Sequence, residues 1–86
     1  MSWDIEAFRE KLTGQHTFPG TYIFKFIVPA DKVPLVERLW TEGRISSKPS
    51  SKGNYVSVTI EGNMQTADEV ISVYQEANKI EGLIAL

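Results

Sequence analysis

The most β-prone stretch of the chain reads Thr21-Tyr22-Ile23-Phe24-Lys25-Phe26-Ile27-Val28. β-Branched and aromatic residues, which favour strands, fill every position of it except Lys25. Pro19 and Pro29 bound the stretch on either side. Apolar side chains fall on both alternating faces, a pattern typical of a strand that lies inside a sheet. We therefore predict a central strand over residues 21–28.

Two further strands are predicted, joined by a hairpin turn. Residues 54–61 alternate valine or isoleucine with mostly polar side chains, which indicates a half-buried strand. Residues 44–50 form a weaker, polar strand that contains Pro49. Because proline donates no hydrogen bond to a neighbouring strand, we expect this strand at an edge of the sheet. A tight turn through residues 51–53 connects the two.

A helix is predicted over residues 31–42, between the first two strands. Asp31 can cap its start, Pro34 falls in the first turn, where its missing N–H has no cost, and Gly43 ends it. The residues expected to form its buried stripe are Leu35, Val36, Leu39 and Trp40.

The chain offers three more elements. A helix begins at a capping box, in which Thr66 and Glu69 each accept a hydrogen bond from a free backbone N–H, and it runs to about Asn78. Residues 80–86 predict a final apolar strand. Residues 3–12 predict an amphipathic helix before the first strand. Its apolar face holds Trp3, Ile5, Phe8 and Leu12.

This order of elements predicts an α+β fold. Right-handed crossovers interleave the two β-α-β units into a four-stranded antiparallel sheet with two helices on one face. The expected architecture is a ferredoxin-like β-α-β-β-α-β sandwich plus an extra N-terminal helix. We assign residues 1–16 to an N-terminal helical extension and residues 17–86 to a single domain.

The sheet face away from the two helices has no predicted cover. It is expected to hold Ile23, Lys25, Ile27, Tyr55, Ser57 and Thr59. The N-terminal helix has to bury its apolar side, and we expect it on this face or on a sheet edge. If it does not fold back, the exposed surfaces predict a homodimer interface.

Composition removes several classes of function. The chain has 86 residues, no cysteine and one histidine. It therefore holds no disulfide, no thiol nucleophile, no cysteine-ligated metal and no pair of histidine ligands, and we expect no metal and no cofactor. The acidic N-terminus is unlike a signal peptide, and no apolar run approaches the roughly 20 residues that span a bilayer. We expect no membrane contact and a cytoplasmic location.

Positive charge gathers in the predicted hairpin. Residues 43–60 contain three basic residues and no acidic one, although the chain as a whole has a net charge of −2. Subtracting the +3 of this segment leaves −5 on the remainder. Such a hairpin can attract a phosphate, a carboxylate or an acidic protein, although a solvated turn has the same composition. The candidate binding residues are Arg44, Lys48, Ser50, Ser51, Lys52, Gly53, Asn54 and Tyr55.

Two other functions are less well supported. RNA-recognition modules share this topology, but residues 52–59 have Asn54, Val56 and Thr59 where the third-strand motif needs aromatic residues. The net negative charge also argues against nucleic acid, which remains the alternative on the open sheet face. No group of residues supplies a nucleophile, a base and an oxyanion donor together, so we predict a protein that is not an enzyme.

Parts of the sequence resemble the YbeD-like family of small bacterial proteins over residues 17–86. The resemblance lies in Phe18-Pro19, in Tyr22-Ile23-Phe24-Lys25 and in Lys48-Pro49-Ser50-Ser51-Lys52-Gly53-Asn54-Tyr55-Val56-Ser57-Val58. It implies a ferredoxin-like fold akin to ACT domains, which sense small molecules, with no established activity and a regulatory role by structural analogy.

One departure matters for that analogy. ACT domains usually place a glycine-bearing loop after the first strand to receive an amino acid, whereas residues 28–31 here contain no glycine. This argues against amino-acid sensing by that route. We therefore expect a regulatory or interaction module that uses the hairpin to contact a protein partner, a second copy of the chain or a small anionic ligand.

Overall fold

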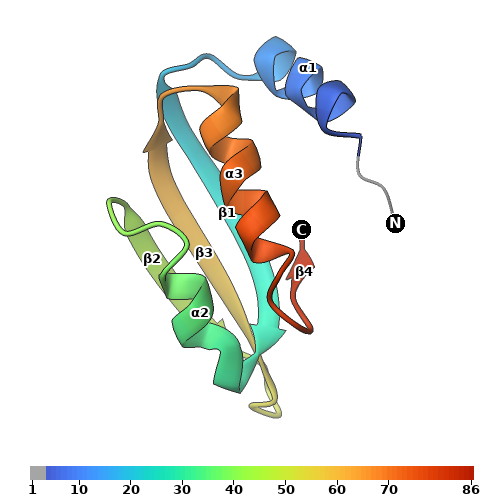
Figure 1. The fold of residues 1–86 in the computed structure, drawn as a ribbon. Coiled ribbons are helices and arrows are strands. Elements are labelled where there is room, and N and C mark those ends of the chain that lie inside the picture. Colours follow the sequence, from blue (N-terminus) through green and yellow to red (C-terminus); the bar gives the residue numbers. More distant parts are fainter. Residues whose placement is uncertain (1–3) are drawn as a thin grey trace.

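The computed structural model describes residues 4–86 and contains three α-helices, one 3₁₀ turn and four strands (Figure 1). Trp3, which was assigned to the first helix, lies outside the described residues. In chain order the elements are α1 (Ile5–Gln15), β1 (Gly20–Pro29), η1 (Ala30–Lys32), α2 (Val33–Glu37), β2 (Arg44–Pro49), β3 (Tyr55–Met64), α3 (Ala67–Ala77) and β4 (Ile84–Ala85).

The four strands form one sheet in the order β2-β3-β1-β4, and every neighbouring pair is antiparallel. The ferredoxin-like arrangement predicted from the sequence is therefore confirmed. β1 and β3 lie at the centre and pair along their whole lengths, from Gly20 opposite Met64 to Pro29 opposite Tyr55. β2 is an edge strand, as Pro49 predicts.

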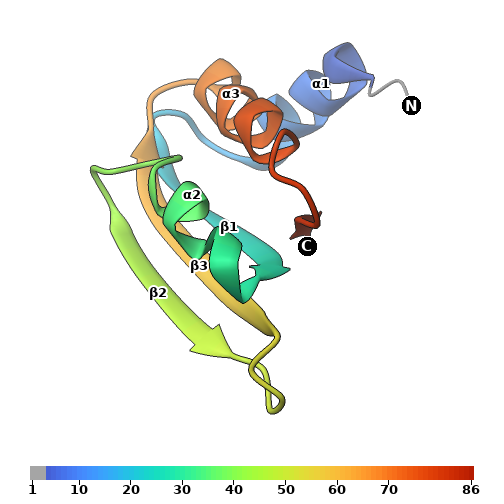
Figure 2. The same ribbon diagram turned by 60° about the horizontal axis from the view of Figure 1, so that its bottom comes forward.

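The hydrophobic core lies between the sheet and the helices, all of which are on one side of the curved sheet (Figure 2). Each large side chain moved out of water here contributes roughly 1.5–3 kcal/mol to folding. The sheet supplies Phe24, Phe26, Val28, Val58, Ile60 and Met64, and the helices supply Val36, Val70, Ile71, Val73 and Ala77. β3 extends three residues beyond its predicted end because Gly62 and Met64 continue the buried alternation.

The helix predicted over residues 31–42 is much shorter in the structure. α2 is Val33–Glu37, preceded by the single turn η1. The chain then leaves the helical path, and the indole of Trp40 lies on Gly62 of β3, where an added Cβ would collide with the ring. Packing of this large ring on β3 outweighs the helix propensity of the residues after Glu37. Helix propensity is a local property, so it does not reveal this contact.

Two side chains of this segment also differ from expectation. Asp31 caps no helix, because neither η1 nor α2 has a side-chain cap. Leu35 is 40% exposed, not buried. A helix of five residues makes fewer than two turns, so only about one of its side chains can point directly at the sheet. In α2 that side chain is Val36, which is fully buried. Pro34 lies in the first turn, as predicted.

The capping box of α3 is confirmed with a small change. Thr66 Oγ1 accepts a hydrogen bond from the backbone N–H of Glu69 at 3.3 Å. The Glu69 carboxylate accepts one in return from the backbone N–H of Gln65, one residue before the cap itself. The helix ends at Ala77, with Asn78 as its C-cap.

The last strand is shorter than the predicted 80–86. Ile80 is buried in the core, and the chain turns at Gly82, whose φ of +83° favours glycine. Only Ile84–Ala85 form β4 beside β1. The backbone N–H of Leu86 adds one more hydrogen bond, to the carbonyl oxygen of Lys25 at 2.9 Å.

The N-terminal helix corrects a further expectation. α1 covers neither the open sheet face nor a sheet edge, because it packs against α3 on the helical side. Leu12 is buried in the core, and the ring of Phe8 meets that of Tyr74 edge-on, with centroids 5.5 Å apart. The apolar side of α3 therefore supplies the burial that α1 needs.

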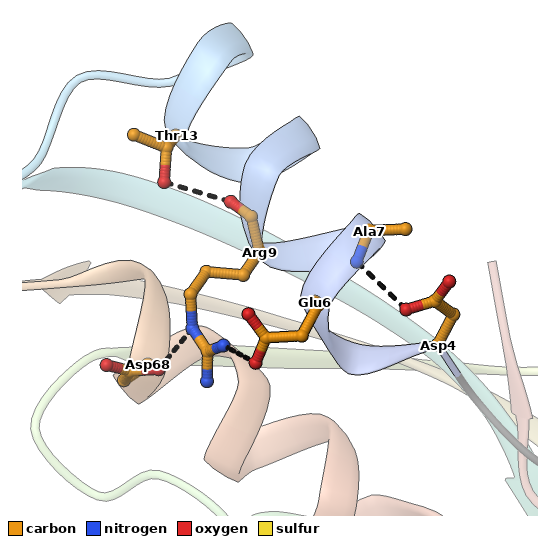
Figure 3. Close-up of polar contacts among 6 residues, drawn as sticks. All are labelled: Asp4, Glu6, Ala7, Arg9, Thr13 and Asp68. Carbon is orange, nitrogen blue, oxygen red and sulfur yellow. Dashed lines mark hydrogen bonds and ion pairs between the residues drawn. The ribbon is translucent and has the colours of Figure 1, made fainter.

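Polar contacts reinforce this packing at the start of α1 (Figure 3). Asp4 accepts a hydrogen bond from the backbone N–H of Ala7 at 3.0 Å and so caps the helix. Arg9 bridges the two helices, with an ion pair to Asp68 of α3 at 2.8 Å and another to Glu6. These two carboxylates raise the pKa of Arg9, that of Glu6 having the larger effect.

Candidate functional site

The sheet face opposite the helices is uncovered by any described element, and we call it the open face. The strand register sets its side chains in rows across the sheet. Because side chains alternate along each strand, every second residue contributes. From β2 to β4 the rows are Arg44-Glu61-Ile23, then Ser46-Thr59-Lys25-Leu86, then Lys48-Ser57-Ile27-Ile84, with Tyr55 beside Pro29 at the end.

Apolar side chains are exposed on the open face. Among residues 4–86, five large hydrophobic side chains are classed as exposed, and four of them lie here: Ile23 (51%), Tyr55 (48%), Ile84 (54%) and Leu86 (68%). Single exposed apolar residues are ordinary, whereas several on one surface make that surface a candidate interaction site. Three of the four lie on the β1–β4 side of the sheet.

Exposed cations lie on the same face, two at its β2 edge and one among the apolar side chains of the β1–β4 side. Arg44 and Lys48 project from β2, and Lys25 projects from β1. Among the side chains of these rows, the one carboxylate is that of Glu61, directly across from Arg44. Within the described part of the chain, none of the three cations has an ion-pair partner. The open face is therefore both apolar and positively charged.

The hairpin turn beyond this face is partly closed by its own hydrogen bonds. Gly53 adopts a φ of +75°, as its sequence position predicts. Its N–H donates to the carbonyl oxygen of Ser50 at 3.0 Å, and the N–H of Tyr55 donates to Ser50 Oγ at 3.4 Å. Two backbone donors that could have held an anion are thus used inside the turn.

The structure divides the residues that the sequence singled out. Arg44, Lys48 and Tyr55 belong to the open face, whereas Ser50, Ser51, Lys52, Gly53 and Asn54 form the turn beyond the end of the sheet. Arg44 and Lys48 are about 13 Å apart along β2, at roughly 3.3 Å per residue, so the basic segment is a strip and not a pocket.

Sequence reasoning missed part of this surface. Ser46, Ile84 and Leu86 share the open face with the residues expected there. The position of Ser46 could have been predicted from the sequence. The hairpin turn sets which residues of β2 and β3 pair, and that register places Ser46 on the same face as Thr59. No such prediction was possible for β4. The predicted strand of seven residues contains a turn at Gly82, and the pairing of β4 with β1 depends on where that turn lies.

Tyrosines occupy the covered side of the sheet. The hydroxyl groups of Tyr22 and Tyr74 lie 3.3 Å apart, within hydrogen-bond distance. Burial, together with this hydrogen bond, raises the pKa of Tyr74 well above its ordinary value. The imidazole of His16 lies edge-on to the ring of Tyr22, with centroids 5.0 Å apart. The phenols thus serve to close the core beneath α1.

A second, shallow groove lies between α2 and α3. Its lining consists of Leu35, Arg38, Leu39, Glu76, Lys79 and Ile80. The ammonium group of Lys79 forms an ion pair with Glu76 at 2.8 Å, which removes one cation from its rim. Leucine and isoleucine side chains form its floor. Because Lys79 is paired, the groove has fewer free cations to attract a ligand than the open face has.

Within residues 4–86 there is neither a metal-binding cluster nor a membrane-spanning helix. No three histidine, aspartate or glutamate side chains gather there to hold a metal ion. No helix in that range combines the length and apolar character that crossing a membrane requires.

Comparison with known proteins places the chain in a family. The family model DUF493, described as a protein of unknown function, matches residues 14–86 and so covers β1 to β4 together with the end of α1. Neither the curated proteins nor the solved structures compared with the chain gave a match. The YbeD-like resemblance refers to the same family, and the chain belongs to DUF493, a family of unknown function.

Proposed function

We propose that this protein is a non-enzymatic interaction module that binds an acidic protein partner on the open face. The observation that supports this best is the combination of exposed apolar side chains with unpaired cations on one surface. A partner that carries carboxylates beside apolar side chains complements both properties of the face. Tyr55, 48% exposed, adds the residue type most often found at binding hot spots.

Charge argues against a second copy as the occupant. Two open faces packed together would bring Lys25, Arg44 and Lys48 of one copy near the same cations of the other, against a single Glu61 on each. Like charges facing one another at an interface cost several kcal/mol. An acidic partner removes this repulsion.

Nucleic acid and small anions fit the face less well. Single-stranded nucleic acid binds through aromatic side chains on which bases stack, and Tyr55 is the only aromatic residue in the rows of the open face. A small anion needs donors that converge, whereas the cations are spread along a strip and the donors of Gly53 and Tyr55 are used within the turn.

A titration of the isotope-labelled protein followed by NMR tests the proposal. The probes are a decapeptide of alternating glutamate and leucine, oligouridylate and inorganic phosphate. We expect the peptide to shift amide signals of β2 and of the open-face residues of β3, with an affinity that falls as salt is raised. The double variant Arg44→Glu, Lys48→Glu should weaken binding at least about tenfold, since two attractive charges become repulsive.

The matched control is Lys11→Glu, Arg38→Glu. It makes the same change in net charge at two exposed residues outside the open face, and it should bind the peptide as the wild type does. Equal weakening by both variants would show that net charge alone attracts the peptide, and the proposal would fall. Tighter binding of oligouridylate or phosphate than of the peptide would replace the protein partner by that ligand.

A further inference from the structure

β1 is only partly covered on its outer side. β3 pairs with all 10 residues of β1, but β4 pairs with Phe26 and Ile27 only. The N–H of Leu86 extends this pairing by one hydrogen bond, to the carbonyl of Lys25. β4 accordingly lies beside the end of β1 that leads into α2, and not beside the end that follows α1 (Figure 1).

The uncovered part presents backbone groups that can pair. Residues of a strand direct their N–H and C=O groups alternately to either side. The bond to Lys25 shows that odd-numbered residues of β1 face outward, and the bond from Ala30 N–H to the Asn54 carbonyl on the β3 side agrees with this. Thr21 and Ile23 therefore face outward as well, and no group within residues 4–86 pairs with their N–H or C=O.

The opposite edge of the sheet is different. The N–H of Ser50 donates to the carbonyl of Tyr55 at 2.8 Å, so even-numbered residues of this strand face β3. Ile45, Ser47 and Pro49 face outward. Pro49 has no N–H to offer, and an edge proline is a common means of blocking strand addition.

We propose that the free edge of β1 at Thr21 and Ile23 takes up one extended acidic segment of a partner protein as a fifth strand. This inference rests on the proposed function and names the form in which the partner binds. Addition of a strand to a sheet edge gains affinity from main-chain hydrogen bonds and specificity from alternate side chains. The segment would lie beside Thr21 and Ile23, on the same side of β1 as β4.

The surroundings of the edge select the side chains of that segment. A residue opposite Ile23 would point onto the open face, diagonally next to Lys25, and a glutamate there reaches the ammonium group. Its neighbours would point to the helical side, and the one opposite Tyr22 would meet that partly buried ring, where an apolar side chain is favoured. Alternation of acidic and apolar residues satisfies both faces.

The test uses an N-acetylated hexapeptide of alternating valine and glutamate with the full chain. In the free protein, the amide hydrogens of Thr21 and Ile23 should exchange with solvent much faster than those of Tyr22 and Phe24, which face β3. Addition of the peptide should slow the exchange of Ile23. A peptide of valine and lysine, or one N-methylated on its edge-facing amides, should fail to do so.

Two proline variants complete the test. Ile23→Pro removes an outward N–H from the free edge and should weaken peptide binding about tenfold. Ser47→Pro removes an outward N–H from the edge of β2 and should leave binding unchanged. If Ile23→Pro fails to fold, the N-methylated peptide decides by itself, since it leaves the protein intact.

The outcomes separate this inference from the proposed function. Peptide binding that neither N-methylation nor Ile23→Pro weakens would overturn strand addition and leave the open face as the site. Protection of Ile23 by the hexapeptide, together with no shift of the β2 and β3 amide signals by the glutamate–leucine decapeptide, would overturn the proposed function and leave strand addition. No slowing of Ile23 exchange at millimolar peptide would overturn strand addition.

Discussion

On β1, Phe24 points to the helices and is fully buried, whereas its neighbour Ile23 points the other way and is 51% exposed. The same contrast runs along the strand, since Phe26 and Val28 are also fully buried. The two faces carry similar apolar side chains but have different surroundings. One is covered by α1, α2 and α3, and the other by no described element.

This difference separates two uses of apolar residues. On the covered face they stabilise the fold, because burial removes them from water whenever the chain folds. On the open face they stay exposed and gain little from folding, and we propose that a partner buries them. Stability measurements should therefore respond to the covered face, and binding measurements to the open one. The predictions below test that separation.

The largest effect is expected from paired truncations on β1. Phe24→Ala should lower the free energy of unfolding by about 3–5 kcal/mol, because it leaves a cavity in the core. Ile23→Ala should change it by no more than about 0.5 kcal/mol, as for other surface positions. Urea denaturation measures both. Similar losses in the two variants would contradict the contrast between the faces.

A second pair tests the cover that α1 provides. Leu12→Ala should cost about 2–3 kcal/mol, since Leu12 is only 3% exposed and fills the space between α1 and the core. Leu86→Ala, at a side chain 68% exposed, should have almost no effect. Thermal unfolding of the two variants side by side gives the comparison. A stable Leu12→Ala protein would mean that α1 does not belong to the cooperative fold.

A third pair concerns hydroxyl groups. Thr66→Ala removes the cap of α3 and should cost about 1 kcal/mol. Ser46→Ala removes an exposed hydroxyl group from the open face and should be neutral for stability. Chemical denaturation resolves a difference of this size. Equal effects would show that the cap is not what holds the start of α3.

The smallest effect is a loss of stability at alkaline pH. The raised pKa of Tyr74 favours the neutral phenol in the folded state, while the unfolded chain ionises near pH 10. The unfolded state therefore binds fewer protons above about pH 10, and stability falls as pH rises, by less than about 1 kcal/mol at pH about 10.5. Tyr74→Phe should lose less stability between about pH 9 and about pH 10.5 than the wild type. An identical loss in both would contradict the role of Tyr74.

Short sequence patterns correctly predicted those elements of the fold that depend on residues close together in the sequence. The alternation in β1 and β3 and the capping box at Thr66 each depend on residues a few positions apart. The short α2 could not be predicted in this way. It depends on Trp40 meeting Gly62, which is 22 positions further along the sequence. The packing of α1 on α3 depends on Phe8 meeting Tyr74 and is equally non-local.

The candidate site shows the same limit. Charge counting found Arg44 and Lys48, because both lie in one acid-free segment. Strand alternation placed Lys25 on the open face, but no sequence pattern showed that Ile84 and Leu86 lie there too, since that follows from the strand order and register. The sequence also named Arg44 and the Lys48–Tyr55 hairpin as the site, whereas three of the four exposed apolar side chains of the open face (Ile23, Ile84 and Leu86) lie outside that hairpin.

Pro49 has a consequence for the number of partners. A sheet with two open edges can act as a bifunctional unit, which adds strands on both sides and grows into a polymer. On the β2 edge Pro49 withholds one of three outward N–H groups, and within residues 4–86 the β1 edge is open at Thr21 and Ile23, so we expect strand addition at the β1 edge alone. Such a monofunctional unit terminates growth after one addition. Complexes formed through this sheet should therefore stop at a stoichiometry of one to one.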